Sequence, residues 1–231
     1  MSATSATLAG AVLAGGASSR MGRDKARLRL AGVPLWRRQL RVLQDAGAAP
    51  VLLVQRAGQR PPARGVLVVN DRIPGAGPLA GLHAALAATD ARWLAVLAVD
   101  MPAIDPAWFA WLRTFCRPGV GAAARHAGGS EPLAAIYPRE ALAVVSARLA
   151  RGERSLQGLV TVLARGRRLR LVPLPPAERW RVANWNSPGD LVRIRPYDTA
   201  PAVDGIAAAA GGAIPAAVRN KSGRNSSRGS A

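Results

Sequence analysis

The 231-residue sequence predicts an α/β fold, a doubly wound and mainly parallel sheet with helices on both faces. Three observations predict this fold. Short apolar runs alternate with segments whose apolar residues recur at helical spacing, which is the pattern of repeated β-α units. Hydrophobic residues make up 49% of the chain, which is enough for one core. Glycine-rich or acidic segments follow several of the apolar runs, at the strand ends where such sheets bind ligands.

The first half of the chain carries four of the expected strands, each a short apolar run, over residues 8–14, 51–54, 66–69 and 93–99. The last of these is the most apolar run in the sequence, so we expect it to be a central strand. Pro34 opens a helix with apolar residues at helical spacing, and Gly47 ends it. A second helix carries Leu79, Leu82 and Leu86.

The second half of the chain is less regular. We expect strands over residues 120–124, 132–137 and 169–174, and helices over residues 139–150, 155–163 and 188–194, the last capped by Ser187. These elements assign residues 1–195 to one domain. Residues 196–231 form an Ala/Gly/Pro-rich basic tail with few side chains to bury, and we expect this tail to be disordered.

The composition excludes several kinds of site and location. A single cysteine, Cys116, rules out an intramolecular disulfide framework, and we expect it to be a small buried residue. The two histidines, His83 and His126, are too far apart in the sequence to suggest a histidine metal cluster. No apolar run reaches the roughly 18–20 residues that span a bilayer, and the first residues lack the basic start of a signal peptide. We therefore expect a cytoplasmic protein with no membrane partner.

The net charge of +19 is the kind of excess that accompanies nucleic-acid binding. The basic residues, however, are mostly arginines, and they are scattered without interleaved aromatic residues. The abundance of Ala, Arg, Gly and Pro indicates a general compositional bias. We therefore do not expect nucleic acid to be the partner, although a basic surface also attracts small polyanions.

A glycine-rich segment with two basic residues follows the first strand, over residues 13–25. The paired glycines Gly15 and Gly16 let the backbone approach a ligand closely and offer amide donors to phosphate oxygens. Arg20 and Lys25 supply positive charge for a triphosphate. The pattern is neither the P-loop nor the dinucleotide fingerprint. The alternative is a tight strand-to-helix turn with solvated basic residues.

A lone carboxylate, Asp100, ends the most apolar strand. Because this strand end faces the glycine-rich loop in the expected sheet, Asp100 is a candidate ligand for Mg²⁺, which prefers hard oxygen atoms. The alternative is that Asp100 caps a helix that begins near Pro102.

Four segments together resemble the molybdenum cofactor guanylyltransferases, in the same order along residues 8–194. They are Leu-Ala-Gly-Gly with the following Arg-Met-Gly and Asp-Lys, the stretch from Asp71 to Gly81, Asp100-Met101-Pro102, and the segment from Asn184 to Leu191. The first segment alone is common to many sugar-phosphate-type nucleotidyltransferases. The resemblance implies the Rossmann-like nucleotidyltransferase form of the doubly wound fold.

The resemblance also implies roles for individual residues. The nucleotide-binding residues would be Leu13, Ala14, Gly15, Gly16, Lys25, Asp71 and Asp100, with Asp71 near the base or ribose and Lys25 on the phosphates. Asn184 and Asn186 would lie toward the pterin substrate. Gln55 is the nearest match to a polar residue that the family places after its second strand.

The implied reaction is attack of the terminal phosphate of molybdopterin on the α-phosphorus of GTP, with release of pyrophosphate. Asp100, Lys25 and Arg20 would be its catalytic residues, with Mg²⁺ on Asp100 and the two basic side chains on the leaving pyrophosphate. The implied partners are GTP, molybdopterin or the molybdenum cofactor, and other proteins of molybdenum cofactor or molybdoenzyme maturation.

Three alternatives remain open. Cytidylyl transfer to the same pterin is the nearest, but that sister group usually carries Leu-Ala-Ala-Gly, so Gly15 favours guanine. Transfer to a sugar or polyol phosphate is disfavoured by the Gly-Pro-Leu-Ala-Gly stretch over residues 77–81. A basic RNA- or anion-binding protein with a degenerate site is disfavoured because Arg20, Lys25, Asp71 and Asp100 are all present.

Overall fold

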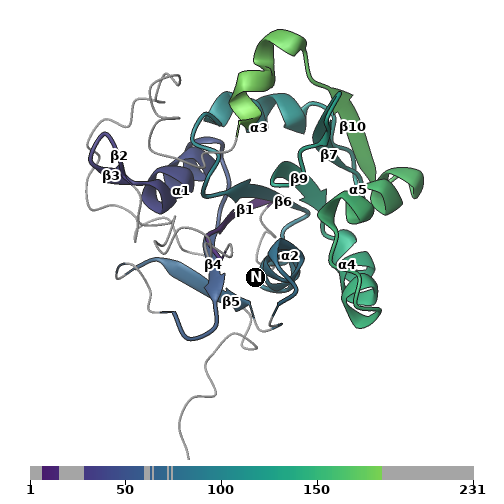
Figure 1. Ribbon diagram of the computed structural model, residues 1–231, viewed down its shortest axis with the longest axis horizontal. Coiled ribbons are helices and arrows are strands. Elements are labelled where there is room, and N and C mark those ends of the chain that lie inside the picture. Colours follow the sequence, from purple (N-terminus) through teal and green to yellow (C-terminus); the bar gives the residue numbers. More distant parts are fainter. Residues whose placement is uncertain are drawn as a thin grey trace, which may run out of the picture.

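The computed structural model describes residues 7–15, 29–59, 63, 65–71, 73 and 75–183. Within these residues the central feature is an eight-stranded sheet in the order β10-β7-β9-β6-β1-β4-β5, with β8 paired to β7 (Figure 1). Its strands are β1 (Leu8–Leu13), β4 (Val51–Arg56), β5 (Leu67–Asp71), β6 (Trp93–Ala98), β7 (Gly121–His126), β8 (Gly129–Ser130), β9 (Ala134–Pro138) and β10 (Leu169–Pro173).

The expected mainly parallel sheet is confirmed. The pairs β1·β4, β1·β6, β4·β5 and β7·β10 are parallel, whereas β9 runs antiparallel to β6 and β7. Strand β6 lies at the centre of the order, as its apolar sequence predicts, and pairs with β1 from Leu8↔Trp93 to Leu13↔Ala98. Strand β5 extends to Asp71, two residues beyond its expected end.

Helices cover both faces of the sheet (Figure 1). They are α1 (Leu35–Asp45), α2 (Pro78–Ala87), α3 (Pro106–Arg113), α4 (Ala141–Ala150), α5 (Leu156–Arg165) and the 3₁₀ helix η2 (Pro176–Val182). Side chains alternate along the strands between two apolar clusters, so that Leu97 packs with α1 and α3, while Val96 packs with α2, α4 and α5. The doubly wound arrangement is therefore present.

Some elements were not expected from the sequence. These are the hairpin of β2 (Arg29–Leu30) and β3 (Val33–Pro34), helix α3, strand β8 and η2. Two other expectations, the helix over residues 188–194 with its cap Ser187 and the tail over residues 196–231, lie outside the described residues. Among the residues that the structure describes, no helix combines the length and the hydropathy that a membrane crossing requires.

Helix α3 begins at a capping carboxylate, Asp105. Its Oδ1 accepts a hydrogen bond from the backbone N–H of Trp108 at 3.0 Å. Its Oδ2 accepts a second one from the Arg181 guanidinium at 2.7 Å, which ties η2 to the start of α3. Pro106 in the first turn completes a common helix-start signal. Asp105 thus fixes the point where the segment after β6 enters a helix.

Replacing Asp105 with alanine should lower the free energy of unfolding by about 1–2 kcal/mol, because the first turn of α3 loses its cap. Asp105→Asn is the matched control, since asparagine keeps a capping oxygen but gives up the charge facing Arg181, and it should lose less. Urea denaturation followed by tryptophan fluorescence measures both. An Asp105→Ala protein as stable as wild type would show that the cap contributes nothing.

Candidate functional site

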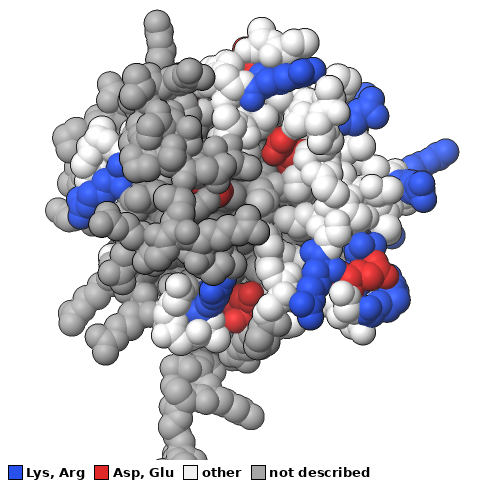
Figure 2. Space-filling view, viewed as in Figure 1, with Lys and Arg blue, Asp and Glu red and all other residues white. Residues whose placement is uncertain are grey.

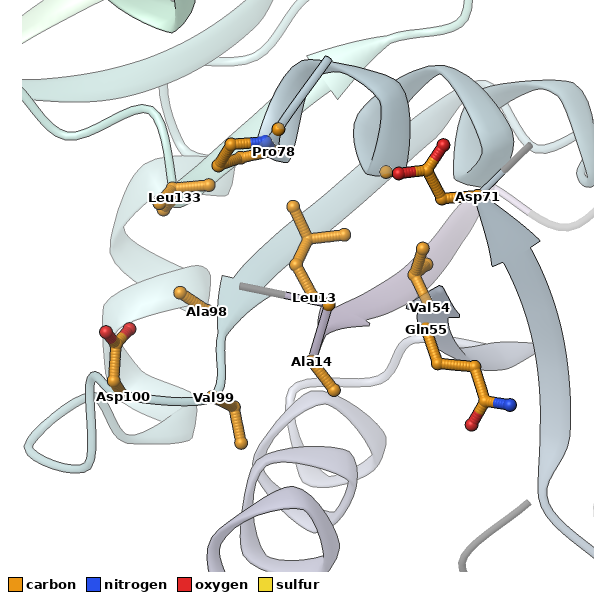
Figure 3. A pocket seen from close by; sticks show the side chains of 13 residues that line it. Leu13, Ala14, Val54, Gln55, Asp71, Pro78, Ala98, Val99, Asp100 and Leu133 are labelled. Atoms are coloured by element: carbon orange, nitrogen blue, oxygen red, sulfur yellow. The ribbon is translucent and has the colours of Figure 1, made fainter. Parts of the chain in front are cut away.

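A pocket of about 220 Å³ opens where the parallel strands β1, β4, β5 and β6 end (Figure 3). Because parallel strands end at a common edge, four segments that are distant in the sequence meet here. The lining residues are Leu13, Ala14, Gly15, Val54, Gln55, Asp71, Gly77, Pro78, Gly81, Ala98, Val99, Asp100 and Leu133. The pocket thus lies at the edge of the sheet where the sequence predicted the ligand.

The backbone after β1 is held between its two neighbouring strands. Ala14 N–H donates to the carbonyl of Val54 at 2.9 Å, and Val99 N–H donates to the carbonyl of Leu13 at 3.2 Å. These bonds continue the ladders one step beyond the strand, so the chain at residues 13 and 14 is fixed on both sides. These bonds hold the backbone at this wall of the pocket in one position.

Gly15 is the last residue described before residues 16–28. Its carbonyl accepts a hydrogen bond from Arg56 Nε at 2.9 Å, which links the loop to the end of β4. A Cβ built on Gly15 would lie 3.6 Å from Arg56 Cγ, an ordinary van der Waals contact. Packing against the part of the chain that the structure describes therefore does not require glycine at this position.

Two carboxylates lie on opposite sides of the pocket, with Leu13 between them (Figure 3). Asp71 is the last residue of β5, and its Oδ1 accepts a hydrogen bond from Ile73 N–H at 2.8 Å. This Asx-type turn directs the chain toward α2. Asp100 follows β6, and both carboxylates are only half-buried. The pocket therefore presents oxygen ligands on two walls.

Asp100 does not cap a helix, so that alternative reading of the sequence is wrong. The chain after Asp100 makes turns over residues 101–104, and the next helix, α3, is capped by Asp105. Asp100 therefore stands at the pocket wall without serving as a helix cap.

Gln55 and Leu133 complete the described walls. Gln55 is 4% exposed, and its Nε2 donates to the carbonyl of Gln59 at 2.5 Å, so the residue that matched only loosely by sequence does line the pocket. Leu133 was not expected from the sequence. It lies just before β9, and its carbonyl accepts a hydrogen bond from Ala98 N–H at 2.8 Å. An antiparallel strand begins at the edge where its parallel neighbours end, which brings Leu133 into the site.

Five of the candidate residues lie outside the described residues. They are Gly16, Arg20, Lys25, Asn184 and Asn186. The structure brings together Leu13, Ala14, Gly15, Asp71 and Asp100, with Gln55 beside them.

The described pocket walls contain no thiol or imidazole. His83 contacts Ser146, with 3.0 Å between Nε2 and Oγ. His126 Nε2 lies 2.6 Å from Glu131 Oε1, and burial raises the pKa of that carboxyl. Cys116 is 5% exposed, and burial raises the pKa of its thiol to about 11. The expectation of a buried cysteine is confirmed.

Basic side chains occupy separate groups on the face shown in Figure 2, not one continuous stripe, as far as the coloured atoms show. Several arginines are paired with carboxylates, including Arg139 with Asp90 and Arg148 with Glu153.

Comparison with known proteins gives consistent matches. Residues 10–169 match the family described as MobA-like NTP transferase domain. A relative from Opitutus terrae, named probable molybdenum cofactor guanylyltransferase, is 63% identical over 198 residues, which is 84% of this chain and 98% of that protein.

Two solved structures share the fold. Molybdopterin-guanine dinucleotide biosynthesis protein A from Archaeoglobus fulgidus has a TM-score of 0.59 and 24% identity, over 80% of this chain and 95% of that one. A Mycobacterium tuberculosis protein solved as a complex with manganese has a TM-score of 0.51 and 21% identity, over 74% and 89% of the two chains. At these identities the structures support the nucleotidyltransferase-type fold alone.

Cys116 should not react with Ellman's reagent at pH 8 while the protein is folded. The thiol is buried, and with a pKa of about 11 it stays protonated at that pH. The same chain in guanidinium chloride should release one equivalent of thionitrobenzoate, and a Cys116→Ala control should release none. Rapid reaction of the native protein would show instead an accessible thiolate.

Proposed function

This chain belongs to the MobA-like NTP transferase family, and from that premise we propose that it is a molybdenum cofactor guanylyltransferase. It transfers GMP from GTP to a molybdopterin-type cofactor and releases pyrophosphate. The observation that carries this function is the 63% identity to a relative of that name across 98% of the relative's length. The pocket at the carboxyl edge of the sheet supports this proposal, because it is where nucleotide-binding sheets of this kind hold their ligands.

The GTP side of the site is the wall formed by β1, β4 and β5. The fixed backbone of Leu13, Ala14 and Gly15 would hold the guanine nucleotide, with Asp71 toward its base or ribose. Gln55, at the end of β4, offers an amide beside the same wall. Backbone groups held by two neighbouring strands cost little to order on binding, which favours affinity.

The residues present fit a divalent cation, and we propose Mg²⁺ on Asp100. Among the described residues, no three His, Cys, Asp or Glu side chains gather into a cage for a metal ion. Mg²⁺ usually binds through one or two carboxylates together with substrate phosphates, and a single carboxylate at a pocket wall suits this mode. Such an ion, when bound, supplies positive charge against the phosphate oxygens.

The chain's own residues would then bind and orient the two substrates. Arg20 and Lys25, carried by the glycine-rich segment, would bind the pyrophosphate as its charge develops, and Asn184 and Asn186 would face the pterin. An oxygen of the molybdopterin phosphate forms a bond to the α-phosphorus of GTP, and the bond from that phosphorus to the pyrophosphate oxygen breaks. Such a transfer needs alignment and charge neutralisation more than a protein nucleophile. A site whose described walls lack thiol and imidazole suits it.

The alternatives are less well supported. Family and relative both point to guanylyl transfer, which disfavours the cytidylyl and sugar-phosphate readings. The same similarity disfavours a basic RNA-binding protein with a degenerate site.

GTP with Mg²⁺ should bind at least about tenfold more tightly than CTP, or about 1.4 kcal/mol, because Gly15 leaves room beside the base. Gly15→Ala should reduce this preference, since its methyl group would enter that space while contacting Arg56 without a clash. Calorimetric titration of the wild-type and Gly15→Ala proteins with GTP and with CTP measures the two affinities. Equal affinities of the wild-type protein for the two nucleotides would overturn the guanylyl assignment and leave the family assignment intact.

Asp100→Asn should abolish turnover and leave the thermal midpoint nearly unchanged. Asparagine keeps the shape of the side chain but removes the negative charge that would hold the cation. The measurement is pyrophosphate release at saturating GTP, Mg²⁺ and molybdopterin. Asp45→Asn, at the exposed end of α1, is the matched control and should retain activity. Turnover of Asp100→Asn within about threefold of wild type would remove Asp100 from the catalytic scheme.

A further inference from the structure

A buried glutamine on α1 contacts the backbone on both sides of Asp100. Gln39 is fully buried, at 0% exposure, among the apolar residues between α1 and the sheet. Its Nε2 donates to the carbonyl of Met101 at 2.8 Å and to the carbonyl of Ala98 at 3.3 Å. The two acceptors flank the dipeptide that ends in Asp100.

The orientation of this amide is fixed by its neighbour. Arg38, 2% exposed, donates from Nη1 to Gln39 Oε1 at 3.1 Å. Because an arginine can only donate, the amide oxygen must face Arg38 and the amide nitrogen must face the two carbonyls. Turning the amide over would forfeit all three hydrogen bonds inside the core, where an unsatisfied polar group is costly.

The backbone hydrogen bonds of the turn that carries Asp100 are long, and one of them runs from Ile104 N–H to the Met101 carbonyl at 3.3 Å. Strand β6 ends at Ala98, and the turn's own hydrogen bond, from Met101 N–H to the Ala98 carbonyl, is long at 3.4 Å. The Gln39 amide also donates to the carbonyls at both ends of that turn. Because Val99 N–H also donates to the Leu13 carbonyl at 3.2 Å, the position of the Asp100 backbone depends on the β1 ladder together with a side chain of α1, a helix that packs on both β1 and β6.

We propose that Gln39 is a positioning residue for Asp100, and through it for the divalent cation of the guanylyl transfer proposed above, on which this inference rests. Side chains that hold a metal ligand in place typically contribute about 10–100-fold to metal affinity. A role confined to stability would lower the thermal midpoint and leave the metal affinity of the folded protein unchanged.

The test compares Gln39→Met with Gln44→Met, the same substitution at a half-buried position of the same helix. Methionine keeps the length of the side chain and removes both donors. Mn²⁺ serves as the probe, and electron paramagnetic resonance measures its binding in the presence of GTP, well below each protein's thermal midpoint. Gln39→Met should weaken Mn²⁺ binding about tenfold and lower kcat at saturating GTP, whereas Gln44→Met should match wild type.

A second variant guards against misfolding. Gln39→Glu keeps the side-chain length and the oxygen that Arg38 contacts, and it replaces the donor nitrogen with a carboxylate oxygen facing the two carbonyls, so it should also weaken Mn²⁺ binding. Conversely, added Mn²⁺ should partly restore the rate of either variant, which a loss of stability alone would not allow.

The outcomes separate this inference from the proposed function. GMP transfer by the wild-type protein together with unchanged Mn²⁺ affinity in folded Gln39 variants would overturn the inference and keep the function. A wild-type protein that binds Mn²⁺ with GTP but transfers no GMP would overturn the function. The Mn²⁺ affinities of the Gln39 variants would in that case still show whether Gln39 positions Asp100. Failure of both variants to fold would make the residue's role structural and overturn the inference.

Discussion

The parallel pairing of β1 with β4 on one side and β6 on the other is the constraint on which the candidate site depends. Parallel neighbours must end at the same edge of a sheet. Residues 13, 55, 71 and 100 therefore meet at the pocket although they are far apart in the sequence. The buried strands supply the rigidity, because their apolar side chains pack into clusters on both faces. Only the short loops that follow these strands at the pocket then need to be held in place by other contacts.

Polar side chains hold that backbone in several places. Arg56 reaches from β4 to the carbonyl of Gly15, Gln39 reaches from α1 to the carbonyls beside Asp100, and Asp105 ties α3 to Arg181. Each adds a hydrogen bond from a side chain to a group near the edge of the sheet. Guanylyl transfer relies on alignment of phosphates, so fixed loops matter more to it than a reactive side chain.

The sequence predicts the strands well, because runs such as Trp93–Ala98 are buried on both faces and so are apolar throughout. The sequence does not show the direction of β9, because an apolar run has the same pattern in a parallel and in an antiparallel strand. The place of Leu133 at the pocket was therefore not predicted. Helix α3 was missed although Asp105 and Pro106 signal its start, since the helix is short and follows a turn. Gln39 gives no local signal, because its acceptors lie 59 and 62 residues away.

The antiparallel β9 also means that the central strand β6 pairs with a strand that is synthesised later. Residues up to Ala98 contain all of β5, β4, β1 and β6, whose parallel pairs need nothing that follows. Strand β6 is then an open edge, and it stays open until the chain has emerged as far as Pro138. An unpaired apolar edge is a template for wrong pairing between nascent chains. The most apolar strand of the molecule therefore lacks its second neighbour until about 40 further residues have been synthesised.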